Sequence, residues 1–387
     1  MTRDTGSAQA TGTARREDLP LAVQPPGEAL AVTVFRYGQA GAQPKAYLQA
    51  GLHADEFPGM LALRHLREML DEADRQGRIL GEIVLVPQAN PIGLRQQVGG
   101  FLLGRFDTQT GGNFNRDYPD LAVLIGDGLD GALGADPAVN VAAIRAAMAE
   151  ALAGLPAPDS PVASLRQVLM RLAHDADFVF DLHADNQALR HLYVGTPLWP
   201  DALDLASEID ARAVLLAEVS GGNPFDEACS GPWWTLAQLY PDAAVPPACL
   251  AATLELGSND DVDIQTAQDQ AAALYRVLER RGVVAGPTES RLPELRCEAT
   301  PLTAMEQVKA PVAGLVAYRL RLGDRVRTGD VVASVIDPLG EAVDVVAETD
   351  GLLFARHSQT YAWPGKVIGK IAGTSPLSSR QGKLLTD

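Results

Sequence analysis

The feature that most constrains the fold of this chain is a regular alternation of short apolar runs with amphipathic helical stretches. Strands that alternate with helices are typical of an α/β domain. We therefore expect a mixed central sheet flanked by helices over residues 26–288. The strand-like runs are ALAVTVFRYG (29–38), KAYLQAGL (45–52), EIVLVPQAN (82–90), DFVFDLHA (177–184), AVLLAEV (213–219) and CLAATLELG (249–257). The helical stretches between them are 57–76, 138–153, 161–174, 200–211 and 263–281.

A change in composition after the last helical stretch divides the chain. Pro287 and Pro293 lie among polar residues, and beyond them the helical pattern gives way to short strand-like runs separated by Gly-Asp turns. This pattern predicts a small all-β domain over residues 293–373. The first twenty residues are polar and small, and we expect residues 1–25 to form a disordered tail and residues 374–387 a second tail.

The charge balance of the chain argues against several classes of partner. Its 49 Asp and Glu residues outnumber 32 Lys and Arg, and the formal charge of −17 repels nucleic-acid phosphates and anionic lipid surfaces. The sequence has no run of about 18 apolar residues, the length of a membrane-spanning helix. Cys229, Cys249 and Cys297 form no C-x-x-C pair and are expected to be reduced core thiols. We therefore expect a cytoplasmic protein that binds neither nucleic acid nor membranes.

The segment LQAGLHADEFPG places His53 and Glu56 three positions apart, between an expected strand and an expected helix. On such a turn the two side chains can converge. Imidazole and carboxylate groups are ligands of catalytic zinc, which takes three protein ligands and keeps a fourth position for water. The alternative interpretation is a surface histidine beside an acidic residue, and a third ligand is needed to distinguish the two.

His183 is the candidate third ligand. It lies in FVFDLHADN at the end of an expected buried strand, where α/β proteins commonly build their sites. Asp181, two residues earlier, is placed to orient the imidazole. The alternative is a histidine that only pairs with Asp181 or Asp185 at the strand terminus.

Glu255 is an acidic residue inside the otherwise apolar run at 249–256, apart from Thr253. Burial of a lone carboxylate is costly, so such a residue usually faces a polar cavity or a cation. Near a metal it would take a proton from water and pass it to a leaving nitrogen. A strand-end glutamate paired with an arginine is the alternative.

The segment GRFDTQTGGNFNRDYPD forms a Gly-rich, non-periodic loop that contains Arg105, Asn115 and Arg116. Long loops in compact domains are often functional. Guanidinium groups bind carboxylates through two hydrogen bonds, and they also stabilise an oxyanion that develops on an amide. The alternative is a set of solvated surface arginines.

Taken in order, GLHADEFPG, the NP of QANPIGL, GRFD with GGNFNRDYP, DLHAD and LELG resemble the succinylglutamate desuccinylase/aspartoacylase family of the zinc carboxypeptidase clan. The resemblance covers roughly residues 45–260. It implies a zinc carboxypeptidase-like fold and one zinc ion per chain. The implied ligands are His53, Glu56 and His183, with Glu255 as general base and acid.

The same resemblance implies a reaction. Zinc-activated water would hydrolyse the amide bond of an N-acyl amino acid or a related small amide that bears a carboxylate. Arg105 would polarise the scissile carbonyl, and Asn115 and Arg116 would hold the carboxylate of the amino-acid portion. Arg95 in NPIGLRQQ is an alternative to Arg105, because the loop length leaves the register open.

The C-terminal stretch KAPVAGLVAYRLRLGDRVRTGDVVASVID resembles a biotinyl- or lipoyl-type barrel, which presents a carrier lysine on a hairpin. The acceptor position falls near Gly340, and no lysine occurs between Arg325 and Arg356. We therefore expect no carrier function. The domain is expected to cover the active site, to mediate assembly of a homo-oligomer or simply to stabilise the chain.

Two other functions stay open from the sequence. A carboxypeptidase that acts on short peptides needs the same ligands, with a pocket for a C-terminal residue; the segment with Trp233 and Trp234 is a candidate lining for a pocket, although paired tryptophans are more often core or interface. A non-catalytic binding or scaffold protein is the alternative from another class, and the intact ligand set argues against it.

Overall fold

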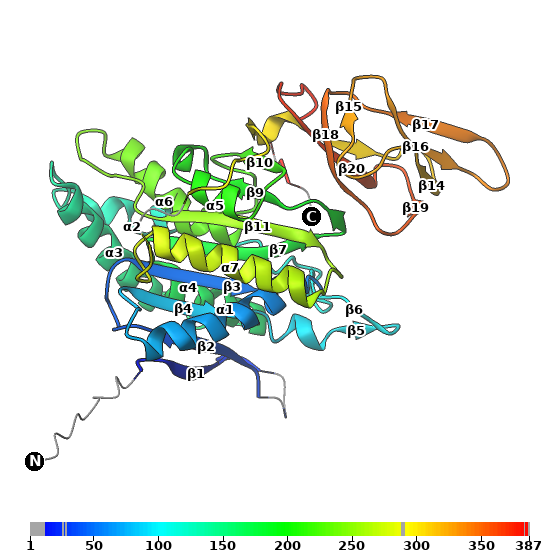
Figure 1. The fold of residues 1–387 in the computed structure, drawn as a ribbon. Coiled ribbons are helices and arrows are strands. Elements are labelled where there is room, and N and C mark those ends of the chain that lie inside the picture. Colours follow the sequence, from blue (N-terminus) through cyan, green and yellow to red (C-terminus); the bar gives the residue numbers. More distant parts are fainter. Residues whose placement is uncertain (1–11, 25–26, 28, 288–290, 383, 386–387) are drawn as a thin grey trace, which may run out of the picture.

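The computed structural model describes residues 12–24, 27, 29–287, 291–382 and 384–385. Its largest element is a nine-stranded sheet with the order β1-β2-β4-β3-β7-β11-β9-β10-β12 (Figure 1). Strand β11 runs parallel to β7 and antiparallel to β9, which confirms the expected mixed sheet. The strands are β1 (Arg15–Pro20), β2 (Ala31–Tyr37), β3 (Lys45–Ala50), β4 (Glu82–Val86), β7 (Phe178–Asp185), β9 (His191–Val194), β10 (Ala213–Leu216), β11 (Leu250–Ser258) and β12 (Ala299–Pro301).

Helices cover both faces of this sheet (Figure 1). Helix α1 buries Leu63, Leu66 and Leu70, whose spacing of three and four residues places them on one side of the helix. Helices α1 (Pro58–Arg75), α5 (Leu203–Glu208) and α7 (Ile264–Arg280) share one apolar core with the sheet. Helices α2 (Leu121–Ile125), α3 (Pro137–Ala153), α4 (Pro161–Ala173) and α6 (Phe225–Leu239) share the core on the other face.

The structure differs from the expected tail at the N-terminus. Residues 1–11 lie outside the described residues, but β1 pairs antiparallel with β2 at the edge of the sheet. The Asp74 carboxylate of α1 anchors the approach to β1, because it accepts a 2.6 Å hydrogen bond from the Thr13 hydroxyl. The expectation of a disordered tail is therefore wrong for residues 15–20. Their sequence, RREDLP, has no apolar run that would mark a strand. An edge strand such as β1 has a neighbour on one side only and is largely exposed to solvent, so it does not need apolar residues.

Several elements of the α/β domain were not expected, among them strands β9 and β12 and helices α2 and α6. Strand β9 is only four residues long, and β12 adds residues 299–301 to the large sheet beside β10, although the all-β domain was expected to begin at residue 293. Helix α6 contains Pro232, which ordinarily argues against a helix. The polypeptide therefore leaves the α/β domain later than its composition suggests.

The C-terminal residues form antiparallel sheets around a separate apolar core, as expected for an all-β domain (orange in Figure 1). We call residues 305–373 the β domain. One sheet contains β13 (Met305–Lys309), β20 (Val367–Gly373), β18 (Gly351–Arg356) and β15 (Arg325–Val326), and the other contains β17 (Ala342–Val346), β16 (Val331–Ile336), β14 (Gly314–Tyr318) and β19 (Tyr361–Ala362). Gly340 lies in the β16–β17 hairpin.

The β domain is joined to the α/β domain by backbone pairing close to the end of β7. Strand β8 (Gln187–Ala188) pairs antiparallel with β18, and the Leu189 N–H donates to the Phe354 carbonyl over 2.8 Å. This pairing places one edge of the β domain directly beside the residues that follow His183. A small hairpin of β5 (Gln97–Val98) and β6 (Phe101–Leu102) lies in the loop after β4.

The residues after the β domain also differ from the expected tail. The Leu377 N–H donates to the Thr303 carbonyl over 3.0 Å, and the Leu384 N–H donates to the Ser220 carbonyl over 2.8 Å. Leu384 is buried against both domains. The C-terminal segment therefore packs back onto the protein through its described residues. No described helix combines the length and apolar character that a membrane span requires.

Candidate metal centre and active-site cavity

A cavity of about 650 Å³ lies at the carboxyl ends of β7 and β11, where the two domains meet. Six of the residues predicted from the sequence line it: His53, Arg105, Asn115, Arg116, His183 and Glu255. The β domain contributes part of the wall, including Lys309, Arg356, Trp363 and Lys370. We expected the β domain to cover the active site, to mediate assembly or to stabilise the chain, and its position agrees with the first of these roles.

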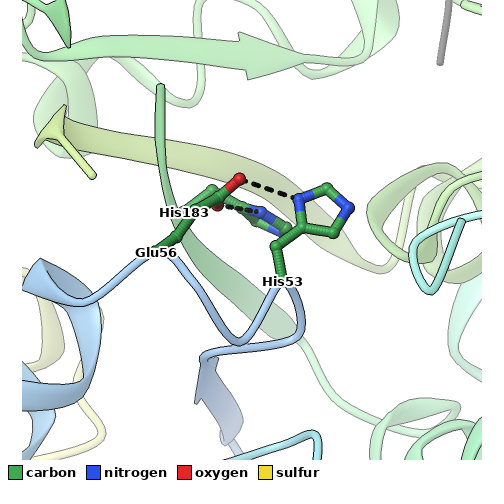
Figure 2. Close-up of side chains that lie close together, drawn as sticks. All are labelled: His53, Glu56 and His183. Carbon is green, nitrogen blue, oxygen red and sulfur yellow. Dashed lines mark hydrogen bonds and ion pairs between the residues drawn. The ribbon is translucent and has the colours of Figure 1, made fainter. Parts of the chain in front are cut away.

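Two of these side chains, His53 and His183, converge with Glu56 beside the cavity. His53 and Glu56 lie in the turn between β3 and α1, and His183 lies on β7. Figure 2 shows the Glu56 carboxylate between the two imidazoles, with Oε1 2.9 Å from Nδ1 of His53 and Oε2 2.8 Å from Nδ1 of His183. One ligand atom from each residue lies within 4.8 Å of the others. His53, Glu56 and His183 form a buried metal-binding triad.

The far side of each imidazole is fixed by a second partner. Nε2 of His183 lies 2.9 Å from the Asp181 carboxylate, which in turn accepts a hydrogen bond from the Gln49 amide. Nε2 of His53 lies 2.9 Å from Oδ1 of Asn113. Such outer partners orient the ring of a metal-binding histidine and leave its other nitrogen for the metal. Asp181 thus orients His183, as its position in the sequence suggested.

The electrostatics of the triad favour a bound cation. Burial alone would lower the pKa of His183, but the Asp181 and Glu56 carboxylates outweigh it and raise that pKa well above its ordinary value. Burial would raise the pKa of Glu56, but its interactions with both imidazoles hold it well below the ordinary value. Two buried carboxylates therefore draw positive charge to this point. Two nitrogens and one carboxylate form a donor set that suits zinc.

Glu255 lies beside the triad on the neighbouring strand. Its register partners are His183 on β7 and His191 on β9, and the Glu255 side chain lines the same cavity. Burial and the nearby Glu56 carboxylate raise the pKa of Glu255 to about 8. Its Oε2 atom is buried and has no hydrogen-bond partner among the described residues. No described arginine pairs with Glu255, so the alternative of a strand-end Glu–Arg pair finds no support in this part of the chain.

The two candidate arginines lie at different places. Nη1 of Arg105 is 3.2 Å from Oε1 of Glu56 and 3.2 Å from Nδ1 of His53, so its guanidinium borders the triad. Arg95 lies on the short 3₁₀ helix Gly93–Arg95 and is not among the described residues that line the cavity. The position of Arg105 favours it over Arg95, and its role stays a prediction.

Asn115 and Arg116 are buried on the loop that precedes α2. The Asn115 amide nitrogen lies 3.4 Å from Nε2 of His183, and its Oδ1 accepts the Phe225 N–H over 2.8 Å. Nη1 of Arg116 donates to the Asn115 carbonyl over 2.7 Å. The loop is therefore packed against the site, and these are not solvated surface residues.

Other parts of the cavity could not be found from the sequence. Trp233 is buried in the core and Trp234 packs beneath Gly195, so neither lines the cavity, whereas Asp226 and Glu227 on the same helix do. The β-domain wall is also new, since residues so far apart in sequence carry no common signal. Cys229 is a buried free thiol, as expected.

Comparison with known proteins agrees with this site. A profile of the succinylglutamate desuccinylase/aspartoacylase catalytic domain matches residues 42–148, which include His53, Glu56 and the arginine loop. The chain is 26% identical to the N-alpha-acetyl-L-2,4-diaminobutyric acid deacetylase of Halomonas elongata over 358 residues, which are 88% of this chain and 84% of that protein.

Two solved structures of this family are similar along almost the whole chain. A family protein from Shewanella amazonensis has a TM-score of 0.80 and 29% identity, over 92% of this chain and 98% of that one. A family protein from Shewanella frigidimarina has a TM-score of 0.79 and 26% identity, over 95% of this chain and 99% of that one. Along most of its length the chain is therefore similar to the succinylglutamate desuccinylase/aspartoacylase family, and this similarity together with the buried triad supports an amidohydrolase of the deacylase type.

Proposed function

We propose that this protein removes the acyl group from small N-acyl amino acids, with one zinc ion held by His53, Glu56 and His183. The observation that carries the proposal is the convergence of this triad with Glu255 in one cavity. When bound, zinc supplies Lewis acidity, which lowers the pKa of a water molecule and polarises a carbonyl oxygen.

Glu255 is the proposed general base and acid. It lies on the strand next to His183, and its unpartnered Oε2 is available to a water molecule or a substrate nitrogen. A pKa near the working pH lets one group both accept and return a proton, and the pKa of Glu255 is raised to about 8 before any cation is added. Glu255 would take the proton of the attacking water and deliver it to the leaving amine.

Arg105, Asn115 and Arg116 are proposed to position the substrate and its developing charge. The Arg105 guanidinium at the edge of the triad is placed to donate hydrogen bonds to the carbonyl oxygen as it becomes an oxyanion. Asn115 and Arg116, which line the same cavity, are proposed to hold the carboxylate of the amino-acid portion.

A small substrate is favoured over the C-terminus of a peptide. The cavity is walled by the β domain through residues such as Arg356 and Trp363, which leave a compact chamber between the two domains. The deacetylase of Halomonas elongata, with 26% identity, points to Nα-acetyl-L-2,4-diaminobutyrate as the first compound to test. A carboxypeptidase would need room for a chain beyond the scissile bond.

The test combines metal content with turnover. Protein purified without chelator should contain about one zinc per chain, should release amine from an N-acyl amino acid in a panel that includes dipeptides, and should lose both properties on dialysis against chelator. The variant His183→Ala should lose zinc and activity together, whereas His65→Ala, on α1 outside the cavity, should keep both. Full zinc occupancy in His183→Ala, or cleavage of dipeptides alone, would contradict the proposal.

A further inference from the structure

The inner end of the cavity is acidic, in contrast to the wall formed by the β domain. Asp226 and Glu227 lie in the first turn of α6, and both line the cavity that contains the triad. Asp226 is 7% exposed, so its carboxylate faces the cavity and not bulk solvent. Thr253 lines the same region, two residues before Glu255 on β11, and residues two apart on a strand point to the same side. This acidic end is therefore continuous with the place where the amide bond would be cleaved.

No described cation pairs directly with either carboxylate, although the charge of Arg116 partly lowers the pKa of Glu227. Among the described residues neither Asp226 nor Glu227 forms an ion pair; one oxygen of Glu227 accepts the Ser220 N–H over 2.8 Å. Burial and the Asp181 carboxylate raise the pKa of Asp226 to about 6, and burial and Asp226 raise the pKa of Glu227 to about 7. Raised pKa values indicate that negative charge is disfavoured here until a positive group arrives.

Three cations on the β-domain wall, Lys370, Arg356 and Lys366, already have partners. Lys370 pairs with Asp185, and Arg356 donates to the Gln187 side chain over 2.7 Å. Nζ of Lys366 donates to the Tyr361 carbonyl over 2.8 Å and to Oε1 of Gln359 over 3.0 Å. Because these cations already have partners, they should attract an acidic substrate less strongly than Asp226 attracts a basic one.

The proposed carboxylate site lies next to the start of α6, and this limits the length of the ligand. Oδ1 of Asn115 accepts the N–H of Phe225, the residue directly before Asp226. A carboxylate held at Asn115 and Arg116 would therefore lie near the first turn of α6, which carries Asp226. Only a short side chain carries its ammonium group between two such neighbouring points.

We propose that Asp226, assisted by Glu227, binds the side-chain ammonium of the substrate, so that this enzyme prefers Nα-acyl diamino acids with a short cationic side chain. This inference rests on the proposed deacylase function and names the specificity residue within it. Thr253 lies close enough to Asp226 to lower the pKa of that carboxyl, although burial outweighs this effect. Asp226 does not touch the scissile bond, so it is a binding residue and should act mainly through KM.

Three substrates that share the N-acetyl amino-acid backbone and differ in side-chain charge test this preference. They are Nα-acetyl-L-2,4-diaminobutyrate, the uncharged isostere N-acetyl-L-norvaline and the acidic analogue N-acetyl-L-glutamate. The zinc-loaded wild-type protein should prefer the diaminobutyrate derivative to the norvaline derivative by about 100-fold in kcat/KM, as expected for a buried charge pair. Asp226→Asn should lose about 100-fold on the cationic substrate, mainly through KM, and change turnover of the norvaline derivative by less than about threefold. The retained norvaline activity shows that the variant folds.

Controls separate Asp226 from general effects of charge. Glu227→Gln should lose less than Asp226→Asn, and Asp127→Asn, at an exposed site in the 3₁₀ helix Gly126–Leu129, should behave as wild type. L-2,4-diaminobutyrate should inhibit the wild type competitively and inhibit Asp226→Asn much more weakly.

Two results would contradict the inference and leave the deacylase function standing. In the first, the wild type hydrolyses the norvaline or glutamate derivative as fast as the cationic one. In the second, Asp226→Asn keeps the preference for the cationic substrate. If the wild type hydrolyses no N-acyl amino acid, the inference and the deacylase function are both wrong.

Discussion

Asp185 at the end of β7 forms a largely buried ion pair with Lys370 of β20, which joins the strand that carries His183 to the β domain. Burial opposes both charges, yet their attraction holds the pKa of Asp185 well below its ordinary value and raises that of Lys370 above its own. The pair lies beside the backbone pairing of β8 with β18. The wall of the cavity is therefore fixed to the metal centre by charge as well as by hydrogen bonds.

Lys370→Met should destabilise the protein by about 1–3 kcal/mol. The loss of one partner of a buried pair leaves an uncompensated charge, but the Lys370 side chain is 23% exposed, so the effect should fall below the range for fully buried pairs. Urea unfolding at pH 7 measures the change. The double variant Lys370→Met with Asp185→Asn should recover part of the loss, and Lys309→Met, at an exposed position on the same wall, should have little effect. Equal stability of wild type and Lys370→Met would show that the pair contributes nothing.

Glu255→Gln should keep its zinc and lower kcat by about 10²–10⁴-fold. The change removes a proton carrier without removing a ligand, and general acid–base catalysis contributes factors of this size. Metal analysis and turnover of the same preparation test both halves of the prediction. Glu255→Asp, which keeps a carboxylate, should be more active than Glu255→Gln. Near-normal activity in Glu255→Gln would move the proton transfer to another residue.

Arg105→Ala should lower kcat by about 10²-fold or more, whereas Arg95→Ala should stay within a few fold of wild type. Arg105 borders the triad at 3.2 Å from Glu56, and loss of a donor to a developing oxyanion has effects of this size. Because Arg105 also contacts Glu56, zinc content must be measured beside kcat. A larger loss in Arg95→Ala than in Arg105→Ala would reverse the assignment.

The sequence predicts the parts of the fold that have long patterns. Strands β7 and β11 are long apolar runs, and α1 and α7 are amphipathic over many turns, so their positions were predicted within a few residues. Strand β9 has four residues, too few to show the alternation of apolar and polar residues that marks a strand. Helix α6 contains Pro232, which argues against a helix when only the sequence is known. Elements whose formation depends on tertiary neighbours leave little trace in the local sequence.

The sequence likewise predicts some residues of the candidate site and not others. His53, Glu56, His183 and Glu255 each follow or interrupt an apolar strand, so their chemistry stands out against their surroundings. The Asp185–Lys370 pair does not stand out, because its members are distant in the chain and become neighbours only when β8 pairs with β18. Local contrast identifies residues that hold a metal, but the walls that select a substrate depend on how the domains dock.

His191 should make the protein less stable in acid. It is fully buried on β9 against Phe354 of the β domain, with ring centroids 4.8 Å apart, and its Nε2 has no partner among the described residues. Burial lowers the pKa of His191 to about 4, although the Asp185 carboxylate opposes this shift. In the unfolded chain a histidine titrates near pH 6.5.

Between about pH 6.5 and pH 4 the unfolded chain therefore binds a proton that the folded protein does not, so the free energy of unfolding should fall as the pH falls through this window. The slope from His191 approaches about 1.4 kcal/mol per pH unit, and the whole window amounts to roughly 3 kcal/mol. His191→Phe keeps a ring against Phe354 and removes the titration, so its stability should fall less over this window than that of the wild type. Urea unfolding of metal-free protein at several pH values tests this, since zinc affinity itself depends on pH. Parallel stability curves for wild type and His191→Phe would show that the histidine is not the group that titrates.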